Sequence, residues 1–503
     1  MTTQETLQVW LDEHHRRCET YNNYSSYYDG TGQEVKLTDR AKTFLEANGF
    51  SDFRINVCSV VVDSMVGRLH VTNFAGSDDF DDWAWELWRL GGVSNRQASL
   101  YRHALIFGDA YLVGEWYDDP LRGVSYPRFV INDPRNCYMV YDQNDIDKPI
   151  AFLKRWKLRP KVSGGTPQWR LNVYLPNRIE RYLGDYGEGA TALQWRLIST
   201  SPWAPGVIPA VHIVNRRGSR AHGYSELRNV ISIQDLLNKS FVDLSLILDQ
   251  QGWPQRWATG GQEPEGGFSS AVGMVWNMPS PEGKFGQFAA ANPLGTLKAI
   301  ESSYAATAAV SRTPPHSFYS PGDRFPSGEA LKTSEVGLIE KCSIFSGDAG
   351  EQFEDMMRIS VKMQKAFGKW PPKPLQPGSD KRRTYSFKIS SQLECQWQDP
   401  ETRNEMLAIQ AVNLKAPLIS HRQALREYGY SDPDIERILR ERVDEDGLAP
   451  GSPQAPAGDA DAKAVINQKS AVQPALSSVK LPGKSSTEQN QPKTQQKSGS
   501  VAE

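Results

Sequence analysis

The sequence predicts an α+β fold, and three observations along its 503 residues lead to that class. Residues 81–116 combine two helical apolar patterns with a short run that is typical of a strand. Residues 127–214 consist of short alternating runs separated by turn residues, which is typical of antiparallel strands. Long helical patterns follow at 225–251, 294–312 and from 327 onward.

The N-terminal region predicts two helices that precede the first strand. ETLQVWLDEHHRRCETYNNYSSYYDG (5–30) indicates a short amphipathic helix that leads into a tyrosine-rich segment. INVCSVVVDSMVGRLHV (55–71) is apolar and β-branched, but its valines and Met65 also recur at helical spacing. We expect a helix through Met65 and a strand from Leu69.

The segment that follows predicts a pair of helices and a strand. Asp81 and Asp82 favour a helix N-terminus, where negative charge is stabilising, and glycines at 91–92 end that helix. A second helix is expected over 94–107 and a strand over 110–116.

The pattern at 225–251 predicts a long helix that packs on more than one side. Leu227, Val230 and Leu237 begin an apolar stripe that other residues broaden beyond that of a surface helix. On the remaining face, Asp235 and Lys239 are expected to form an i,i+4 ion pair.

The C-terminal half predicts a glycine-rich insert, a stiff loop and further helices. The insert contains the strand patterns GMVWNM (273–278) and KFGQFA (284–289). Ser327 is expected to cap a helix that bends or breaks at SGDAG (346–350) and resumes to residue 367. One or two strands then follow within 382–400, and two or three final helices follow them. From Gly447 onward the sequence contains no aromatic residue, so this tail is expected to be disordered.

The composition limits the classes to which this protein can belong. The chain is 39% hydrophobic, carries a net charge of −2 and has five widely spaced cysteines. These totals indicate two to four folding units or one large subunit in a reducing compartment, without a disulfide framework. The charge lacks the basic excess of proteins that grip nucleic acid. No apolar run approaches the ~18 residues of a membrane span, and no export signal is recognised.

The motifs of common enzyme sites are absent or incomplete. LPGKSS (481–486) lacks the first glycine of a phosphate-binding loop, and GYSEL (223–227) lacks the last glycine of a nucleophile elbow. His14 and His15 are adjacent and point apart on a helix, and His103 lies on an apolar helix as a core residue would. The remaining histidines are interpreted as single residues. We therefore expect no catalytic residues, no metal and no cofactor.

The order of these segments resembles the portal proteins of tailed bacteriophages, in the branch found in siphophages of actinobacterial hosts. The resemblance extends over about residues 20–445, and no single motif in it is as specific as a metal signature. The motifs that carry it are YYDG (27–30), INVCSVVVDSMVGRLHV (55–71), DDWAWELWRLGGVSNRQASLYRHALIFGDAYLV (81–113), GYSELRNVISIQDLLNKSFVDLSLILDQQGWPQRWATG (223–260), and SRTPPHSF (311–318) followed by SGEALKTSEVGLIEK (327–341).

The resemblance implies a ring of about twelve subunits at one capsid vertex, through which double-stranded DNA is packaged and ejected. Its implied partners are the terminase large subunit, a head-completion or adaptor protein, and the major capsid and scaffolding proteins. Its implied location is the virion, with assembly in the host cytoplasm and no membrane contact. The same resemblance divides the chain into a wing (1–224), a stem helix (225–252), a clip (253–293), a second stem helix (294–312), a tunnel loop (313–326), a second wing part (327–399), a helical crown (400–446) and the tail (447–503).

This assignment predicts roles for particular side chains. A loop that DNA slides past needs limited backbone freedom, which four prolines within 313–326 supply. An ordinary proline-rich connection on the subunit surface is the alternative for this loop. The DNA-channel candidates are Arg312, His316, Phe318, Tyr319, Arg324 and Lys298. The clip candidates for partner contact are Trp276, Phe285 and Phe288.

Two other classes of function remain open at this point. A phage-encoded nucleic-acid-processing enzyme with a scattered active site is one, and a cellular scaffold with aromatic-rich interfaces is the other. Fourteen tryptophans fit either core and interface anchoring or a platform for a cofactor or sugar.

Overall fold

The computed structural model describes residues 2–32, 54–76, 79–159, 168–185, 195–252, 256–260, 282–287, 292–318, 327–375, 384–388 and 391–401, with a few isolated residues besides. The chain divides into two units, Met1–Thr402 and Arg403–Glu503. The fold described below is that of the first unit. The predicted crown helices and the tail that was predicted to be disordered lie outside the continuously described residues.

The first helix, α1 (Gln4–Asp29), is longer than the sequence analysis expected. The Thr3 hydroxyl caps it by accepting a hydrogen bond of 3.2 Å from the Thr6 backbone amide. The tyrosine-rich segment was expected to follow the helix but forms its last turns. Tyr21 and Tyr27 are buried there and continue the apolar face, so the helical spacing extends further than the aliphatic residues alone indicate.

The main core includes four helices and a two-stranded sheet, together with residues of α1, α6, α7 and neighbouring strands. Large aromatic side chains fill it, among them Trp83, Trp88 and Phe353, which are no more than 1% exposed. Two of the fourteen tryptophans therefore anchor the core. The elements around this core are α3 (Val57–Val66), β1 (Val71–Gly76), α4 (Phe80–Leu90), α5 (Gln97–Phe107), α8 (Gly328–Phe367) and β12 (Leu393–Trp397), with β1 and β12 antiparallel.

The region predicted to contain antiparallel strands does so, in two sheets. A three-stranded sheet has the order β3-β2-β9, and a five-stranded sheet follows the chain order from β4 to β8. Residues of α1, including Leu7 and Leu11, pack with the five-stranded sheet in a second core. The strands are β2 (Asp109–Asp119), β3 (Val124–Asn132), β4 (Cys137–Tyr141), β5 (Pro149–Leu158), β6 (Gln168–Tyr174), β7 (Arg178–Asp185), β8 (Trp195–Pro202) and β9 (Ala210–Val214).

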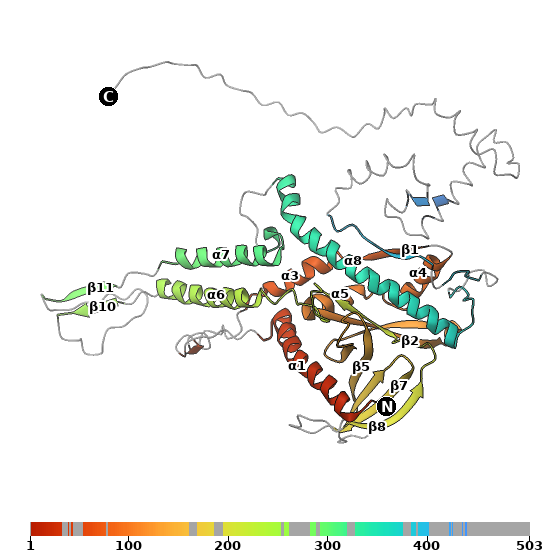
Figure 1. Cartoon of the computed structure of the whole chain (residues 1–503). Helices are drawn as coiled ribbons and strands as arrows, with labels where there is room; N and C mark the ends of the chain where they lie inside the picture. The colour runs from red at the N-terminus through yellow and green to blue at the C-terminus, as the bar shows by residue number, and fades with distance from the viewer. Residues whose placement is uncertain are drawn as a thin grey trace, which may run out of the picture. The chain divides into compact units, whose positions relative to one another are not determined.

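Two helices, α6 (Ile231–Gly252) and α7 (Leu294–Ser311), lie side by side (Figure 1). The predicted Asp235–Lys239 pair is wrong, because the Lys239 ammonium bonds the Asp243 carboxylate at 2.8 Å. Asp235 instead accepts a hydrogen bond of 2.8 Å from the Tyr27 hydroxyl. A tertiary contact from α1 therefore takes the carboxylate that local spacing assigned to a lysine.

A short hairpin follows α6 in the chain. Strand β10 (Arg256–Thr259) pairs antiparallel with β11 (Lys284–Gln287), which is the predicted KFGQFA strand. The other predicted strand, GMVWNM, lies outside the described residues. The pattern analysis missed β10 because the run RWAT is only four residues long.

The 40-residue helix α8 is continuous, so the predicted break at 346–350 is wrong. Its Ser327 cap is confirmed, because the hydroxyl accepts a hydrogen bond of 3.3 Å from the Ala330 amide. A Cβ atom at Gly350 would lie 3.2 Å from the Trp397 indole nitrogen. The small residues here let β12 approach the helix closely and do not interrupt it.

Candidate functional site

The predicted loop residues that the structure describes lie against the body of the subunit. Arg312 ends α7 and forms an ion pair of 3.2 Å with Glu340, with both side chains more than half exposed. His316 lies in the short helix η1 (Pro315–Ser317), 3.8 Å from the Glu335 carboxylate. Phe318 packs against the main core. The beginning of the loop is thus held beside α8.

Two other predicted site residues are described, one on α7 and one on the hairpin strand β11. Lys298 is exposed on α7 and has no ion-pair partner among the described residues. Phe285 lies on β11 and is 43% exposed. Tyr319, Arg324, Trp276 and Phe288 lie outside the described residues.

A buried cluster of charges, here called the Glu226 junction, lies where α6, α7 and α8 meet. The Glu226 carboxylate accepts bonds from Lys341 at 2.6 Å and Arg216 at 2.8 Å, and from the Asn215 amide at 3.0 Å. The Lys341 ammonium also donates to the Ser311 carbonyl at the C-terminal end of α7, at 2.8 Å. A cation is favourable at a helix C-terminus. The junction therefore ties the segment before α6 and the C-terminal end of α7 to α8.

Burial sets the electrostatics of the Glu226 junction. Removal from water lowers the pKa of Lys341, and the adjacent Glu226 carboxylate opposes that shift. The Lys341 and Glu226 side chains are 4% and 1% exposed. Breaking such a pair leaves one charge buried without compensation, which is costly.

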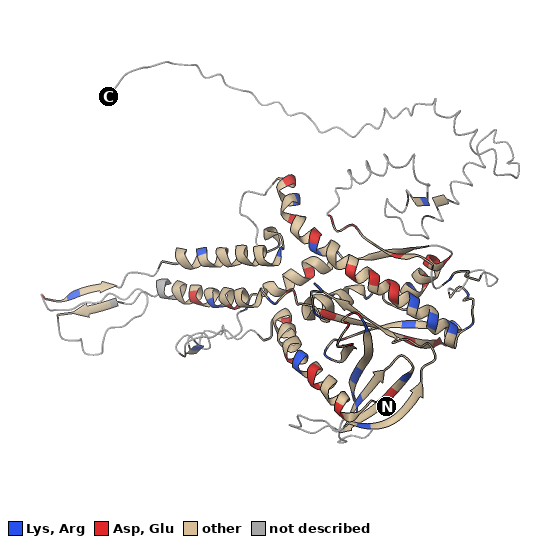
Figure 2. Cartoon of the chain, in the orientation of Figure 1, with Lys and Arg blue, Asp and Glu red and all other residues tan. Residues whose placement is uncertain are grey.

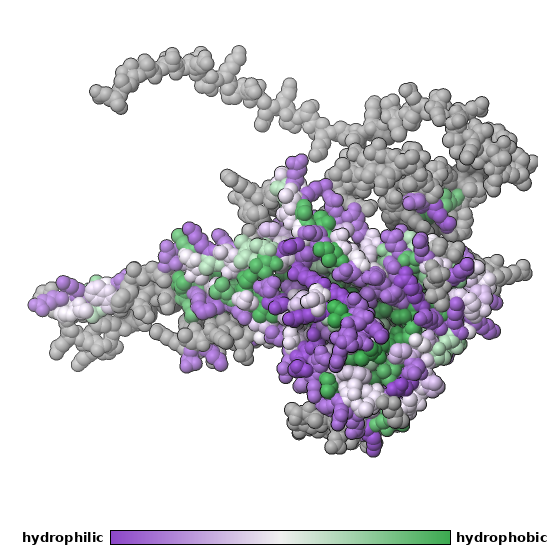
Figure 3. Space-filling view, in the orientation of Figure 1, coloured by the Kyte–Doolittle hydropathy of each residue, from purple (hydrophilic) through white to green (hydrophobic). Residues whose placement is uncertain are grey.

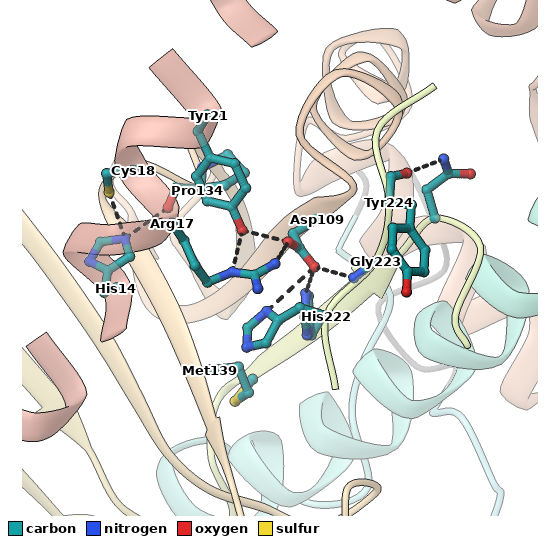
Figure 4. Close-up of polar contacts among 12 residues, drawn as sticks. His14, Arg17, Cys18, Tyr21, Asp109, Pro134, Met139, His222, Gly223 and Tyr224 are labelled. Carbon is teal, nitrogen blue, oxygen red and sulfur yellow. Dashed lines mark hydrogen bonds and ion pairs between the residues drawn. The ribbon is translucent and has the colours of Figure 1, made fainter. Parts of the chain in front are cut away.

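A second buried cluster, here called the Asp109 network, lies at the start of β2 (Figure 4). One oxygen of Asp109 accepts bonds from the Arg17 guanidinium at 2.7 Å and from the Tyr21 hydroxyl. The other oxygen accepts from His212 Nε2 at 2.9 Å and from the Gly223 amide at 3.0 Å. The network thereby joins α1, β2, β9 and the segment before α6.

Asp109 is ionised in this network. Burial by itself raises the pKa of Asp109, but the hydrogen bond from His212 and the nearby His222 ring hold it well below its usual range. Burial lowers the pKa of His212 to about 4, against the opposing effect of Asp109. Burial also lowers the pKa of Arg17, yet Asp109 and Tyr21 outweigh it and raise that pKa. The charge pair in the network is therefore Asp109 with Arg17.

Among the described residues, one group has the donor atoms of a metal site, namely Asp109, His212 and His222. Their ligand atoms lie within 4.8 Å of one another. Both Asp109 oxygens already accept hydrogen bonds, and the Arg17 guanidinium repels a second cation at the same carboxylate. The arrangement fits an ion-paired hydrogen-bond network better than a metal centre.

Sequence reasoning missed this cluster because it treated the histidines as single residues. β9 pairs with β2 so that Val214 lies opposite Asp109. This register brings His212, two residues earlier in β9, close to the Asp109 carboxylate. His222 reaches it because the chain then turns back toward β2. A signal was present in the sequence: the motifs GDAYL and GYSEL, both part of the family resemblance, meet at the Gly223–Asp109 hydrogen bond.

Gly223 lets these two motifs approach one another. A Cβ atom at Gly223 would lie 2.3 Å from the carbonyl oxygens of both Asn215 and Gly108. Gly108 itself has a φ of +87°, a conformation that favours glycine. The backbones therefore approach more closely than any residue with a side chain allows.

Comparison with models of known families matches residues 7–447 to the phage portal protein, SPP1 Gp6-like. The chain belongs to this family of phage portal proteins. The portal proteins of Mycobacterium phages D29 and L5 are each 24% identical to it, over 426 and 430 residues. Each alignment covers 78% of this chain and 82% of the relative. The fold class and the function that the resemblance implied are thereby confirmed at the level of the family.

Two solved structures have similar chains. They are the neck of a native gene transfer agent particle, computed with C12 symmetry, and the virion of such a particle. The TM-scores are 0.40 and 0.39, with 12% identity, and the matches cover 79% of this portal protein and 96% and 95% of those chains. No helix within the described ranges combines the length and apolarity that crossing a membrane requires.

Replacing Gly223 with alanine is expected to lower the free energy of unfolding by about 2 kcal/mol, because the new methyl group collides with two backbone carbonyls. Urea unfolding followed by circular dichroism measures the change. Gly218→Ala is the matched control, since its Cβ would only reach ordinary contact with Tyr224 at 3.7 Å. Equal stability of the two variants would contradict the close approach described here.

Lys341→Met is expected to lower the free energy of unfolding by about 3 kcal/mol, because Glu226 then keeps a buried charge with one partner fewer. Lys239→Met removes a more exposed i,i+4 pair with Asp243 and is expected to cost no more than about 0.5 kcal/mol. The same denaturant titration compares both variants with the unsubstituted chain. A small effect of Lys341→Met would show that the junction contributes little to stability.

Proposed function

We propose that this portal protein forms a ring of about twelve subunits around a channel for double-stranded DNA. In this proposal the ring occupies one capsid vertex, and α6 and α7 are its stem helices. DNA enters the capsid through the channel during packaging and leaves through it on ejection. Family membership supports the proposal, and so do two properties of the stem helices.

The first property, and the observation that carries the proposal, is the apolar surface that α6 and α7 expose in a single chain (Figure 3). Leu236 and Leu248 on α6 are 55% and 52% exposed, and Leu294 on α7 is 60% exposed. Leu297 and Val310 on α7 are also at least 40% exposed. Apolar patches on paired helices indicate a protein contact. A second copy of the same chain is the partner that a ring provides.

The second property is the low charge of α7. Its eighteen residues, LGTLKAIESSYAATAAVS, contain only the charged side chains Lys298 and Glu301 (Figure 2). Duplex DNA carries one negative charge per ~1.7 Å, so a strongly basic channel would retard it. A helix of small and neutral side chains suits a conduit that contacts DNA weakly and without regard to sequence.

The same proposal assigns roles to the remaining segments of the chain. The segment 313–326 is the tunnel loop, and residues 253–293 are the clip that meets the terminase motor and later an adaptor protein. Residues 400–446 are the crown on the capsid side. The protein acts structurally, without catalysis, and belongs to the virion after assembly in the host cytoplasm.

An enzyme with a scattered active site is less well supported. Within the described residues, the Asp109 network is the group that such chemistry would use, and its carboxylate is already bonded to Arg17, Tyr21 and His212. Family membership also points to a structural protein.

Rings with a central hole are expected when the purified full chain is examined by native mass measurement and negative-stain microscopy. Leu236→Glu combined with Leu248→Glu is expected to shift the mass toward monomers, because the charges would enter a subunit contact. Leu121→Glu is the control: this residue is 95% exposed in the β2–β3 turn, and its variant should still form rings. Rings that persist in the α6 variant would contradict the stem assignment.

His316→Ala combined with Arg324→Ala is expected to reduce the length of DNA retained in particles while ring formation is unchanged, because the loop loses its cations toward the phosphates. Packaged DNA is measured by gel electrophoresis of nuclease-treated particles. Arg89→Ala on α4 provides a control in the wing. If the loop variant packages DNA of full length, the loop does not contact the DNA, and the alternative of an ordinary connection on the subunit surface is favoured.

A further inference from the structure

A pocket of about 270 Å³ lies between α1 and the segment that leads into α6. It is separate from the stem surface, and nothing in the proposed ring function accounts for it. Its polar lining includes four arginines, which are Arg16, Arg17, Arg220 and Arg228. Its other lining residues are Thr20, Tyr21, Tyr24, Phe107, His222, Gly223, Tyr224 and Ser225.

The pocket carries uncompensated positive charge. None of its lining residues is acidic. Arg17 is balanced by Asp109 at 2.7 Å, and that carboxylate is fully buried behind the pocket wall. Among the described residues, Arg16, Arg220 and Arg228 have no carboxylate partner. Three exposed arginines therefore line one pocket that has no acidic residue in its lining.

Two of these arginines are oriented by the same aromatic ring. The guanidinium carbons of Arg220 and Arg228 lie 5.7 Å and 5.0 Å from the centre of the Tyr224 ring. Stacking of this kind limits the freedom of a long side chain and positions its donors. Tyr224 is itself held in place, because its backbone amide donates to the Asn215 carbonyl at 3.0 Å.

Tyr24 and His222 also line the pocket. Burial raises the pKa of Tyr24, and the nearby cations Arg228 and Arg17 oppose that shift. His222 is 7% exposed, and its Nδ1 atom makes no hydrogen bond although it lies 3.5 Å from Asp109. Figure 4 shows Arg17 and His222 approaching the Asp109 carboxylate beside Gly223. The Asp109 network therefore supports the pocket from behind.

We propose that this pocket binds a phosphate dianion, either inorganic phosphate or the terminal phosphate of a nucleotide or nucleic-acid strand. Guanidinium groups match phosphate oxygens with paired donors. A phosphate monoester carries close to two negative charges at neutral pH. As a ligand for three arginines it therefore neutralises more charge than a carboxylate ligand, which carries one. The volume is near the lower end of small-ligand pockets, at about 300 Å³, which suits a phosphate with part of an attached group.

Isothermal titration of the full chain tests the site with inorganic phosphate as the probe. The same titration is then run with a short single-stranded oligonucleotide that carries a 5′-phosphate and with the same oligonucleotide without it. Binding of inorganic phosphate is expected, and Arg220→Ala combined with Arg228→Ala should weaken it about tenfold or more. Arg89→Ala, an exposed arginine on α4 outside the pocket, should leave it unchanged.

The oligonucleotide arms identify the source of the phosphate. Tighter binding of the phosphorylated strand than of inorganic phosphate, lost without the 5′-phosphate, indicates a nucleic-acid end. Equal affinity for inorganic phosphate and the phosphorylated strand indicates a site for the free ion. Arg16→Gln is a milder variant on the exposed face of α1. If the double variant does not fold, weaker binding of inorganic phosphate by Arg16→Gln tests the same site.

Three outcomes would overturn the proposal. The first is that phosphate at millimolar concentration produces no binding heat. The second is that the Arg89→Ala control loses as much affinity as the pocket variants, which would indicate only general electrostatic attraction. The third is that a poly-glutamate peptide binds while phosphate does not, which would assign the pocket to an acidic protein segment.

Discussion

The buried carboxylate of Asp109 is the constraint on which the arrangement of α1, β2, β9 and the segment before α6 depends. It accepts hydrogen bonds from Arg17 and Tyr21 of α1, from His212 of β9 and from the Gly223 amide before α6. A buried carboxylate is stable only when it is paired and hydrogen-bonded. The three segments must therefore reach β2 together, which sets the path of the chain into α6.

A second buried carboxylate continues this constraint toward α7 and α8. Glu226 follows Gly223 by three residues, and its bond to Lys341 brings α8 to the base of α6 and α7. Beyond the junction, α6 and α7 expose leucines that no other described part of the chain covers. The same chain thus combines buried ion pairs before α6 with exposed apolar faces on α6 and α7, and such faces suit contact with a protein surface.

Much of the fold was predictable from local patterns. The helices around 57–66 and 80–90, the antiparallel strands after 124 and the Ser327 cap all followed from periodicity and capping residues. The failures share a physical cause. Asp235 bonds Tyr27 from α1 instead of Lys239, and the small residues near Gly350 serve the approach of β12 instead of a helix break. In both cases a distant segment overrode the local preference.

The sequence by itself determined the α+β class, the order of helices and strands, and the family resemblance, because these depend on residue spacing along the chain. Only the tertiary structure brought Asp109, His212 and His222 together and gathered Arg16 and Arg220 at one pocket. These residues are 10 to more than 200 positions apart in the chain. Their meeting depends on strand register, on a glycine contact and on buried charges that must find partners, and none of these leaves a periodic signal in the sequence.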